Sequence, residues 1–195
     1  GNLDAINATN IVGTKTDGGA KTWSAPRCSW TVTSNRAVST RADCPLLVDS
    51  GNTSSIAEVA LARNGSTAWD AGIVLRSNAT ATTLLAVEYT SASNGSVELW
   101  KYNGSWVSLG RTAGLYPSGV ATAPASVTLR VEALAPVAPA TTTTVRARLD
   151  GTQRLSFTLS AADHAIFAAA AQSFVGPYTY FDATTTFDNF HLDIP

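Results

Sequence analysis

Short segments in which apolar and polar residues alternate recur along the chain, and this pattern constrains the fold more than any other feature. Turn-forming pairs separate the segments, among them Asn94-Gly95, Asn103-Gly104 and Asp150-Gly151. Alternation with a period of two predicts strands with one buried and one solvated face, as in antiparallel sheets. The predicted strands are 29–34, 36–41, 45–49, 56–62, 71–76, 84–90, 96–101, 106–110, 127–134, 144–150, 154–159, 173–176 and 186–194.

Two such sheets stacked on their apolar faces form a β-sandwich. The one helix-like stretch is 161–172, where a run of alanines favours a turn or two of helix. The segment 135–144 resembles a linker, but strands of the same kind flank it, so we interpret it as a long hairpin loop. The sequence therefore predicts an all-β, antiparallel two-sheet sandwich with one short helix, and a single domain over residues 1–195.

The chain carries little charge. Charged residues make up 14% of the 195 residues, and the net charge is −1, whereas about a quarter of the residues in an average domain are charged. No basic run occurs, and no stretch approaches the length of a membrane span. We therefore expect no nucleic-acid partner and no membrane insertion.

Two cysteines, Cys28 and Cys44, flank a segment that reads as a strand, a turn at Ser34-Asn35 and a second strand. Antiparallel arms would bring the two sulfur atoms together, so we predict a disulfide, which would stabilise the fold by about 3 kcal/mol. The alternative is a pair of reduced thiols in a cytosolic protein. The low charge and the abundance of Ser and Thr favour the disulfide and an extracellular location.

Residues 97–110, VELWKYNGSWVSLG, predict a hairpin with Trp100 and Trp106 on its two arms. A two-residue type I′ turn at Asn103-Gly104 would pair Trp100 with Val107 and leave both faces mixed. A three-residue loop, 102–104, with Gly104 in the left-handed region, would pair Trp100 with Trp106 and leave one face aliphatic. We therefore predict the second register, in which both tryptophans point away from the core.

Several segments resemble, in their order along the chain, those of concanavalin-like and laminin-G-like jelly-roll domains. They are TDGGAKTWSAPRCSWTVTSNRAVS, DAGIVLRSN, LLAVEY, NGSVELWKYNGSWVSLG, VTLRVEAL, VRARLDGTQRLSF and TTFDNFHL. The chain is similar to appendage domains of secreted bacterial glycan-processing proteins and to minor tail, receptor-binding proteins of phages that infect actinobacteria. The resemblance covers the chain from about Thr16 to Leu192 and implies a jelly roll that binds a glycan outside the cell.

The predicted meander through 71–76, 84–90, 96–101 and 106–110 gives the sheet an outer face that carries aromatic and charged side chains. Aromatic rings stack on the apolar faces of sugars, and carboxylate and guanidinium groups bind their hydroxyls. The alternative is a set of cross-strand pairs that only stabilise the sheet. The candidate ligand-binding residues are Arg76, Glu88, Glu98, Trp100, Trp106, Trp69 and Tyr178. Trp23 and Trp30 are expected in the core.

We expect no catalytic activity, because His164 and His191 are isolated and no nucleophile elbow surrounds a serine. The first alternative is a divergent glycoside hydrolase or polysaccharide lyase in which Glu88 and Glu98 act as acid and base. The second is a structural module that docks other domains of a tail or secreted protein through the same face.

No cofactor is expected to be required. The resemblance implies a structural calcium ion near the joined termini, with Asp188 in FDNF and Asp4 as oxygen ligands. The alternative, which we favour, is that Asp188 caps a turn before the last strand.

Overall fold

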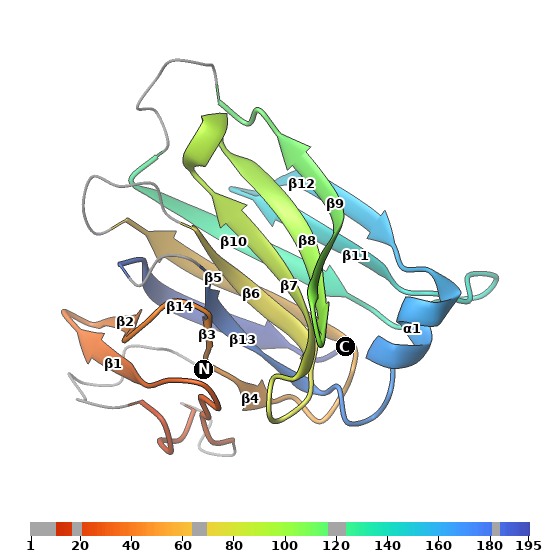
Figure 1. Ribbon diagram of the computed structural model, residues 1–195, viewed down its shortest axis with the longest axis horizontal. Coiled ribbons are helices and arrows are strands. Elements are labelled where there is room, and N and C mark those ends of the chain that lie inside the picture. The colour runs from red at the N-terminus through yellow and green to blue at the C-terminus, as the bar shows by residue number, and fades with distance from the viewer. Residues whose placement is uncertain (1–10, 17–20, 64–69, 117–123, 181–183) are drawn as a thin grey trace.

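The computed structural model describes residues 11–16, 21–63, 70–116, 124–180 and 184–195. Within these residues, two antiparallel sheets lie face to face (Figure 1). The first sheet has the order β1 (Trp30–Thr33), β2 (Arg36–Ser39), β14 (Thr186–Asp193), β5 (Ser55–Ala62), β10 (Ser126–Ala133), β11 (Thr144–Leu149), β12 (Thr152–Thr158). The second has the order β3 (Cys44–Pro45), β13 (Phe174–Thr179), β6 (Asp70–Ser77), β7 (Thr83–Thr90), β8 (Ser96–Asn103), β9 (Trp106–Ala113), and β4 (Val48–Asp49) also pairs with β13.

The main core lies between the sheets and follows the alternation of the sequence. On β5, Ala57, Val59 and Leu61 are fully buried, and Leu129 and Val131 of the neighbouring β10 are buried beside them. The second sheet contributes its own alternate residues, including Ile73, Leu75, Leu85, Val87, Val97 and Leu99. The predicted fold class is therefore confirmed, and so is the core position of Trp23 and Trp30.

The first hairpin, β1–β2, closes through the predicted turn. Ser34 and Asn35 both have positive φ angles, 50° and 58°, as a type I′ turn between twisted strands requires. Cys28 precedes β1 and Cys44 begins β3, and a disulfide joins them with their Cα atoms 5.8 Å apart. The predicted disulfide is thus present in the structure.

Helix α1 (Ala161–Phe167) is shorter than the predicted 161–172. The Ser160 side chain caps its first turn by accepting a hydrogen bond from the backbone N–H of Asp163. Only Asp163 and Phe167 of the helix are buried. The alanines after Phe167 bring no large apolar side chain to the core, and isolated helical turns are unstable without such packing.

The connection between β10 and β11 is the long loop that the sequence predicts. The segment 135–144 joins β10 to β11, which pair directly with each other, so it is a long hairpin loop. A single 3₁₀ turn, η1 (Ala92–Asn94), lies between β7 and β8. No helix among the described residues is long and apolar enough to cross a membrane.

The register of the β8–β9 hairpin differs from the prediction. Trp106 lies opposite Tyr102, and Trp100 lies opposite Ser108, so the predicted pairing of Trp100 with Trp106 is wrong. The loop does have three residues and a left-handed Gly104, with φ of 81°, but it spans 103–105. The difference of two residues keeps each side chain on its predicted face, so Leu109 packs against the main core and both tryptophans point away from it, as predicted.

Candidate functional site

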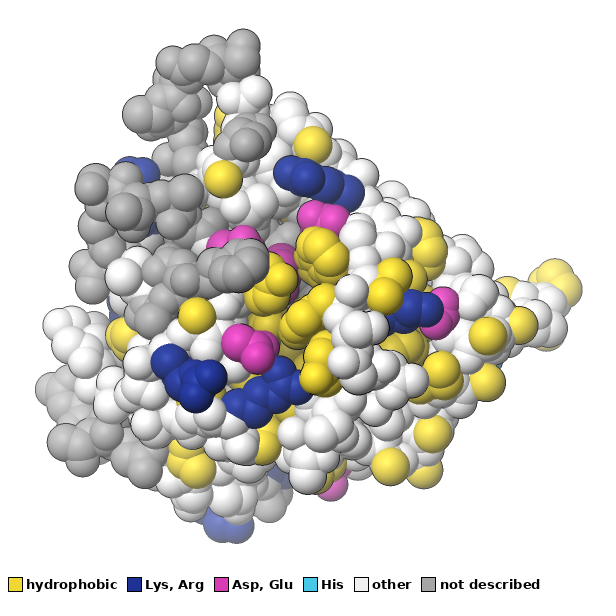
Figure 2. All heavy atoms as spheres, viewed as in Figure 1, with side chains coloured by type: hydrophobic (Ala, Val, Ile, Leu, Met, Phe, Trp, Pro, Cys, Tyr) yellow, Lys and Arg dark blue, Asp and Glu magenta, His cyan; other side chains and the backbone are white. Residues whose placement is uncertain are grey.

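Five aromatic side chains whose rings contact one another gather on the outer face of the second sheet, away from the main core, and Phe174 packs against the same cluster. The five are Trp100 and Tyr102 of β8, Trp106 of β9, Tyr178 of β13 and Tyr180 directly after β13, and together we call them the aromatic face. Figure 2 shows this side of the molecule, with hydrophobic side chains gathered over the second sheet between acidic and basic ones. Tyr178 is buried, and the other four rings are half-buried.

Trp106 contacts three of the other four rings of the aromatic face, and so does Tyr180. The ring centroid of Trp106 lies 5.1 Å from that of Tyr102, 5.9 Å from that of Tyr178 and 5.7 Å from that of Tyr180. Trp100 adds a contact of 6.3 Å with Tyr180. Centroid distances of this size are favourable for offset or tilted aromatic pairs.

Small side chains on the intervening strands let these rings meet. The strands that carry Tyr178 and Trp100 are separated by β6 and β7. On the outer face β6 offers Gly72 and Val74, and β7 offers Ala86 opposite Trp100. Long rings from both sides can therefore reach across the short residues and cover the middle of the sheet.

Glu88 lies on β7 in this covered region. It pairs with Gly72 on one side and with Glu98 on the other, and its side chain is 4% exposed. Its Oε1 atom has no hydrogen-bond partner among the described residues. Burial raises the pKa of Glu88 well above its ordinary value, and the negative charges of Asp70, Glu98 and Asp43 raise it further.

Two ion pairs border the aromatic face. On one side Arg27 Nη1 lies 3.0 Å from both carboxylate oxygens of Asp43, and the Arg27 Cζ atom lies 5.0 Å from the centre of the Tyr102 ring. Tyr178 donates its hydroxyl proton to Asp43 Oδ1 at 2.9 Å. On the other side Glu98 accepts a hydrogen bond of 2.5 Å from Ser108 and lies 3.7 Å from Arg111 Nε.

The structure brings together most of the residues predicted from the sequence. Glu88, Glu98, Trp100, Trp106 and Tyr178 all belong to this outer face or to its border. Their role in ligand binding stays a prediction. Trp69 and Asp4 lie outside the described residues.

Arg76 does not reach this face, so its predicted place beside Glu88 is wrong. Its φ angle is positive, 46°, and the pairing of β6 with β13 shifts register beside it. The bulge turns the side chain into the interior, where it is 2% exposed and lies 3.4–3.5 Å from the backbone oxygens of Phe167, Ala133 and Leu134. Burial lowers the pKa of Arg76 to about 10.

Asp188 forms a local contact, because its Oδ1 accepts a hydrogen bond of 2.8 Å from the backbone N–H of Asn189. Asn189 has a φ angle of 51°, at a bulge of β14. In the part of the chain that the structure describes, no group of three or more His, Cys, Asp or Glu side chains is placed to hold a metal ion. The calcium site stays a prediction.

Sequence reasoning missed Tyr102, which it assigned to the loop, and the pair formed by Arg27 and Asp43. Tyr102 follows Trp100 by two residues, so alternation along β8 would have placed both on one face. Arg27 and Asp43 each directly precede a cysteine of the predicted disulfide. A bond between the cysteines brings their neighbours together, so this signal was present in the sequence.

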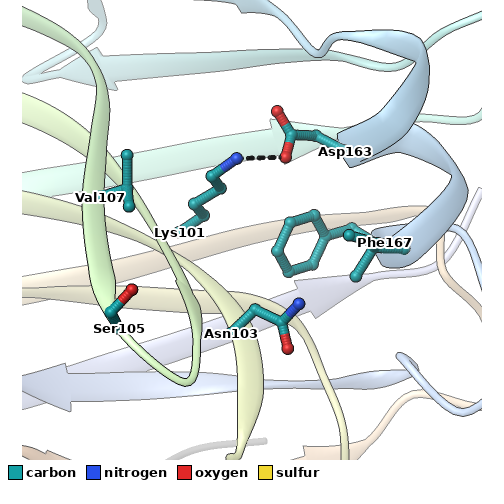
Figure 3. A pocket seen from close by; sticks show the side chains of 7 residues that line it. Lys101, Asn103, Ser105, Val107, Asp163 and Phe167 are labelled. Atoms are coloured by element: carbon teal, nitrogen blue, oxygen red, sulfur yellow. Dashed lines mark hydrogen bonds and ion pairs between the residues drawn. The ribbon is translucent and has the colours of Figure 1, made fainter.

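A hollow of about 190 Å³ lies between the β8–β9 hairpin and α1 (Figure 3). Lys101 and Asp163 point toward each other across it and form an ion pair of 2.5 Å. Burial raises the pKa of Asp163, but hydrogen bonds from Lys101 and Ser160 outweigh this effect and lower it overall. This hollow has one half-buried ion pair and the buried ring of Phe167 in its lining, whereas five rings in mutual contact form the aromatic face.

No protein-family model and no curated protein sequence matches the chain. Among solved structures, the chain is similar to the carbohydrate-binding module CBM66 from Bacillus subtilis, with a TM-score of 0.65 and 15% identity over 97% of this chain and 100% of that chain. The GH43 protein BlXynB from Bacillus licheniformis gives a TM-score of 0.61 and 12% identity over 94% of this chain and 38% of that chain.

A mutant of the alginate lyase Aly36B in complex with an alginate tetrasaccharide gives a TM-score of 0.57 and 10% identity, over 100% of this chain and 95% of that chain. At these identities the similarity concerns the fold. The fold that these chains share is the jelly-roll β-sandwich, and the protein is an all-β sandwich of this class.

The buried carboxyl group of Glu88 gives a prediction for stability. The unfolded chain releases the proton of this residue above about pH 4.5, whereas the folded protein keeps it to higher pH. The folded state then binds more protons, so the free energy of unfolding falls as the pH rises from about 4.5 toward the raised pKa, by up to about 1.4 kcal/mol per pH unit.

Glu88→Gln removes this titration, so the variant should gain stability relative to the wild-type protein as the pH rises. Urea denaturation of both proteins at about pH 4 and about pH 8 measures the change. A stability difference that is the same at both pH values would mean that Glu88 ionises in the folded protein as readily as in the unfolded chain.

Proposed function

We propose that the aromatic face binds a glycan and that the protein is a lectin-like module without catalytic activity. The observation that carries the proposal is the cluster of five rings around Trp106, bordered by carboxyl and guanidinium groups. Apolar C–H faces of a sugar stack on such rings, and its hydroxyls form paired hydrogen bonds with the charged groups. The similarity to a carbohydrate-binding module supports the proposal at the level of the fold.

An extracellular location is part of this proposal. The Cys28–Cys44 disulfide supports it, because disulfides persist in oxidising compartments. A role at a bacterial surface, in a phage tail or in a secreted bacterial protein, stays a prediction. So does the presence of further domains that would accompany this one.

Trp106→Ala tests the proposal. The substitution removes the ring that contacts Tyr102, Tyr178 and Tyr180, so glycan affinity should fall at least about tenfold, as for a central anchor of an interface. A glycan array identifies the bound sugar, and titration calorimetry with that sugar gives the affinity of each variant.

Phe157→Ala is the matched control, because it removes a half-buried ring from β12 of the other sheet. It should leave glycan affinity within about twofold, since sites away from an interface contribute little to binding. Equal losses in the two variants would contradict a specific role of the aromatic face. Solvent protection of Trp106 by a neighbouring protein domain, without any glycan binding, would favour the docking module.

Cleavage of a glycosidic bond is a second candidate, and one observation favours it. Glu88 and Glu98 lie opposite each other on β7 and β8, and their environments differ. Burial and negative neighbours raise the pKa of Glu88, as suits a general acid, whereas Glu98 lies beside Arg111. Release of reducing ends from a polysaccharide, abolished by Glu88→Gln, would establish catalysis and overturn the binding-only proposal.

A further inference from the structure

The Oε1 atom of Glu88, which has no hydrogen-bond partner among the described residues, requires a physical explanation. A buried oxygen without a hydrogen-bond partner loses its contact with water and gains nothing in return. Such atoms are rare in native structures, and a bound ligand or a water molecule is one way in which the missing partner is supplied. The Oε1 atom of Glu88 is of this kind among the described residues.

Glu88 forms the floor of the aromatic face. Its strand, β7, runs between β8, which carries Trp100, and the strands that lead to Tyr180. The rings of Trp100 and Tyr180 have centroids 6.3 Å apart, so they meet above the strands that separate them. Glu88 and Tyr178 both pair with Gly72 of β6, from opposite sides, so the short glycine alone separates them on this face.

The groups that face Glu88 are predominantly acidic. Asp43 precedes β3, Asp70 begins β6 and Glu98 lies on β8, and all three raise the pKa of Glu88. Tyr178 of β13 lies beyond Gly72 in the same row of the sheet, and Tyr180 directly follows β13. The two arginines at the border already pair with carboxylates, Arg27 with Asp43 and Arg111 with Glu98.

We propose that the aromatic face selects an uncharged glycan, with Glu88 as the hydrogen-bonding group at its floor, and excludes glycans that carry carboxylate or sulfate groups. The inference rests on the proposed glycan binding. It adds a substrate class and a specificity-determining residue to it.

The chemistry of a neutral carboxyl group fits an uncharged sugar. A protonated carboxyl group donates one hydrogen bond and accepts others, which is also what a sugar hydroxyl does. A sugar carboxylate would instead add a negative charge close to Asp43, Asp70 and Glu98, and like charges in a partly desolvated site repel strongly. Placing unfavourable charges against the wrong ligand is a general route to specificity.

The first experiment is an array of oligosaccharides that pairs uncharged glycans with their uronic acid counterparts and includes sulfated glycans. One pair is β-1,4-mannohexaose and β-1,4-hexamannuronate. The two share linkage and configuration, but each sugar carries a CH₂OH group in the first and a carboxylate in the second. Bound glycans should be uncharged, and each acidic counterpart should bind at least about tenfold more weakly. An acidic or sulfated glycan that binds as well as an uncharged one would overturn the inference and leave the proposed function standing. Binding of no glycan at all would overturn both.

The second experiment tests Glu88 directly, on the uncharged glycan that gives the strongest array signal. Glu88→Gln keeps a donor and an acceptor, so its affinity should stay within about threefold of the wild-type value. Glu88→Leu removes both and should lose at least about tenfold, and its thermal melting curve verifies that it folds. If the folded Glu88→Leu variant bound the glycan with wild-type affinity, Glu88 would not contact the glycan and the inference would be wrong.

The third experiment tests the exclusion of acids. Glu98→Gln removes one carboxylate and leaves Arg111 without its ion-pair partner. The ratio of the affinity for the uncharged glycan to that for its acidic counterpart should therefore fall at least about threefold. Asp193→Asn is the matched control, because Asp193 is half exposed on β14 of the other sheet, next to His191. An unchanged preference in Glu98→Gln, or an equal change in both variants, would contradict electrostatic exclusion at this face.

Discussion

Trp30→Ala is expected to lower the free energy of unfolding by about 3–5 kcal/mol, the range for removal of a large buried aromatic side chain. Trp30 is fully buried at the start of β1, and its ring packs edge-to-face on Phe187 of β14 with centroids 5.1 Å apart. Strands β1 and β14 lie on either side of β2. The contact between Trp30 and Phe187 therefore packs the edge strand β1 against the core. Chemical denaturation of the wild-type and variant proteins measures the loss.

Trp100→Ala is the matched comparison for Trp30→Ala. Trp100 is half-buried on the outer face, and its ring contact is with Tyr180 outside the main core. Its replacement should cost about 1 kcal/mol, as at other sites away from core packing. The two substitutions should therefore have opposite effects: Trp30→Ala should lower stability and leave glycan affinity unchanged, whereas Trp100→Ala should lower glycan affinity with little loss of stability. A larger loss of stability at Trp100 than at Trp30 would contradict this division.

The strands and the sandwich were predictable because they depend on local alternation. On β5, β6, β7 and β10 the apolar residues at every second position are those that the structure buries between the sheets. The turn at Ser34-Asn35 and the disulfide were also accessible, since both follow from short-range chain geometry. Burial of one face determines register strongly in such strands.

The errors occur where one strand departs from regular pairing. The bulge at Arg76 reverses the direction of one side chain and removes a guanidinium group from the predicted site. In the β8–β9 hairpin the register shifts between Leu99 and Trp100, so that Tyr102 pairs with Trp106 near the turn and Glu98 pairs with Arg111 farther along the strands. A pattern of alternation assumes regular pairing, so it cannot locate an inserted residue.

The candidate site was harder to predict than the fold, because its parts come from distant segments. The Cys28–Cys44 bond holds Arg27 beside Asp43, Asp43 accepts a hydrogen bond from the hydroxyl of Tyr178, and Arg27 lies over the ring of Tyr102. The disulfide therefore supports one border of the aromatic face as well as the first hairpin. Such a chain of contacts becomes visible when the three-dimensional structure is known.

Gly176→Ala is expected to lower the free energy of unfolding by about 3 kcal/mol or more, beyond the usual cost of overpacking a core. Gly176 lies on β13 between Phe174 and Tyr178, on the side of the aromatic face. A Cβ atom at this position would lie 1.8 Å from the backbone oxygen of Leu46. Backbone atoms cannot rotate away as a flexible side chain can, so the two segments would have to separate.

Separation of β13 from the Leu46 segment would also disturb the proposed site. The backbone N–H of Leu46 donates a hydrogen bond to the backbone oxygen of Pro177, the residue before Tyr178, and Leu46 follows Asp43 by three residues. A movement here would pull Asp43 away from the Tyr178 hydroxyl, which is now 2.9 Å from its carboxylate. Gly110→Ala is the control, since its added Cβ would meet the ring of Phe157 at 2.9 Å, and a ring can shift. Urea denaturation should show a loss at Gly110 less than half of that at Gly176, and equal losses would mean that β13 and the Leu46 segment can separate without cost.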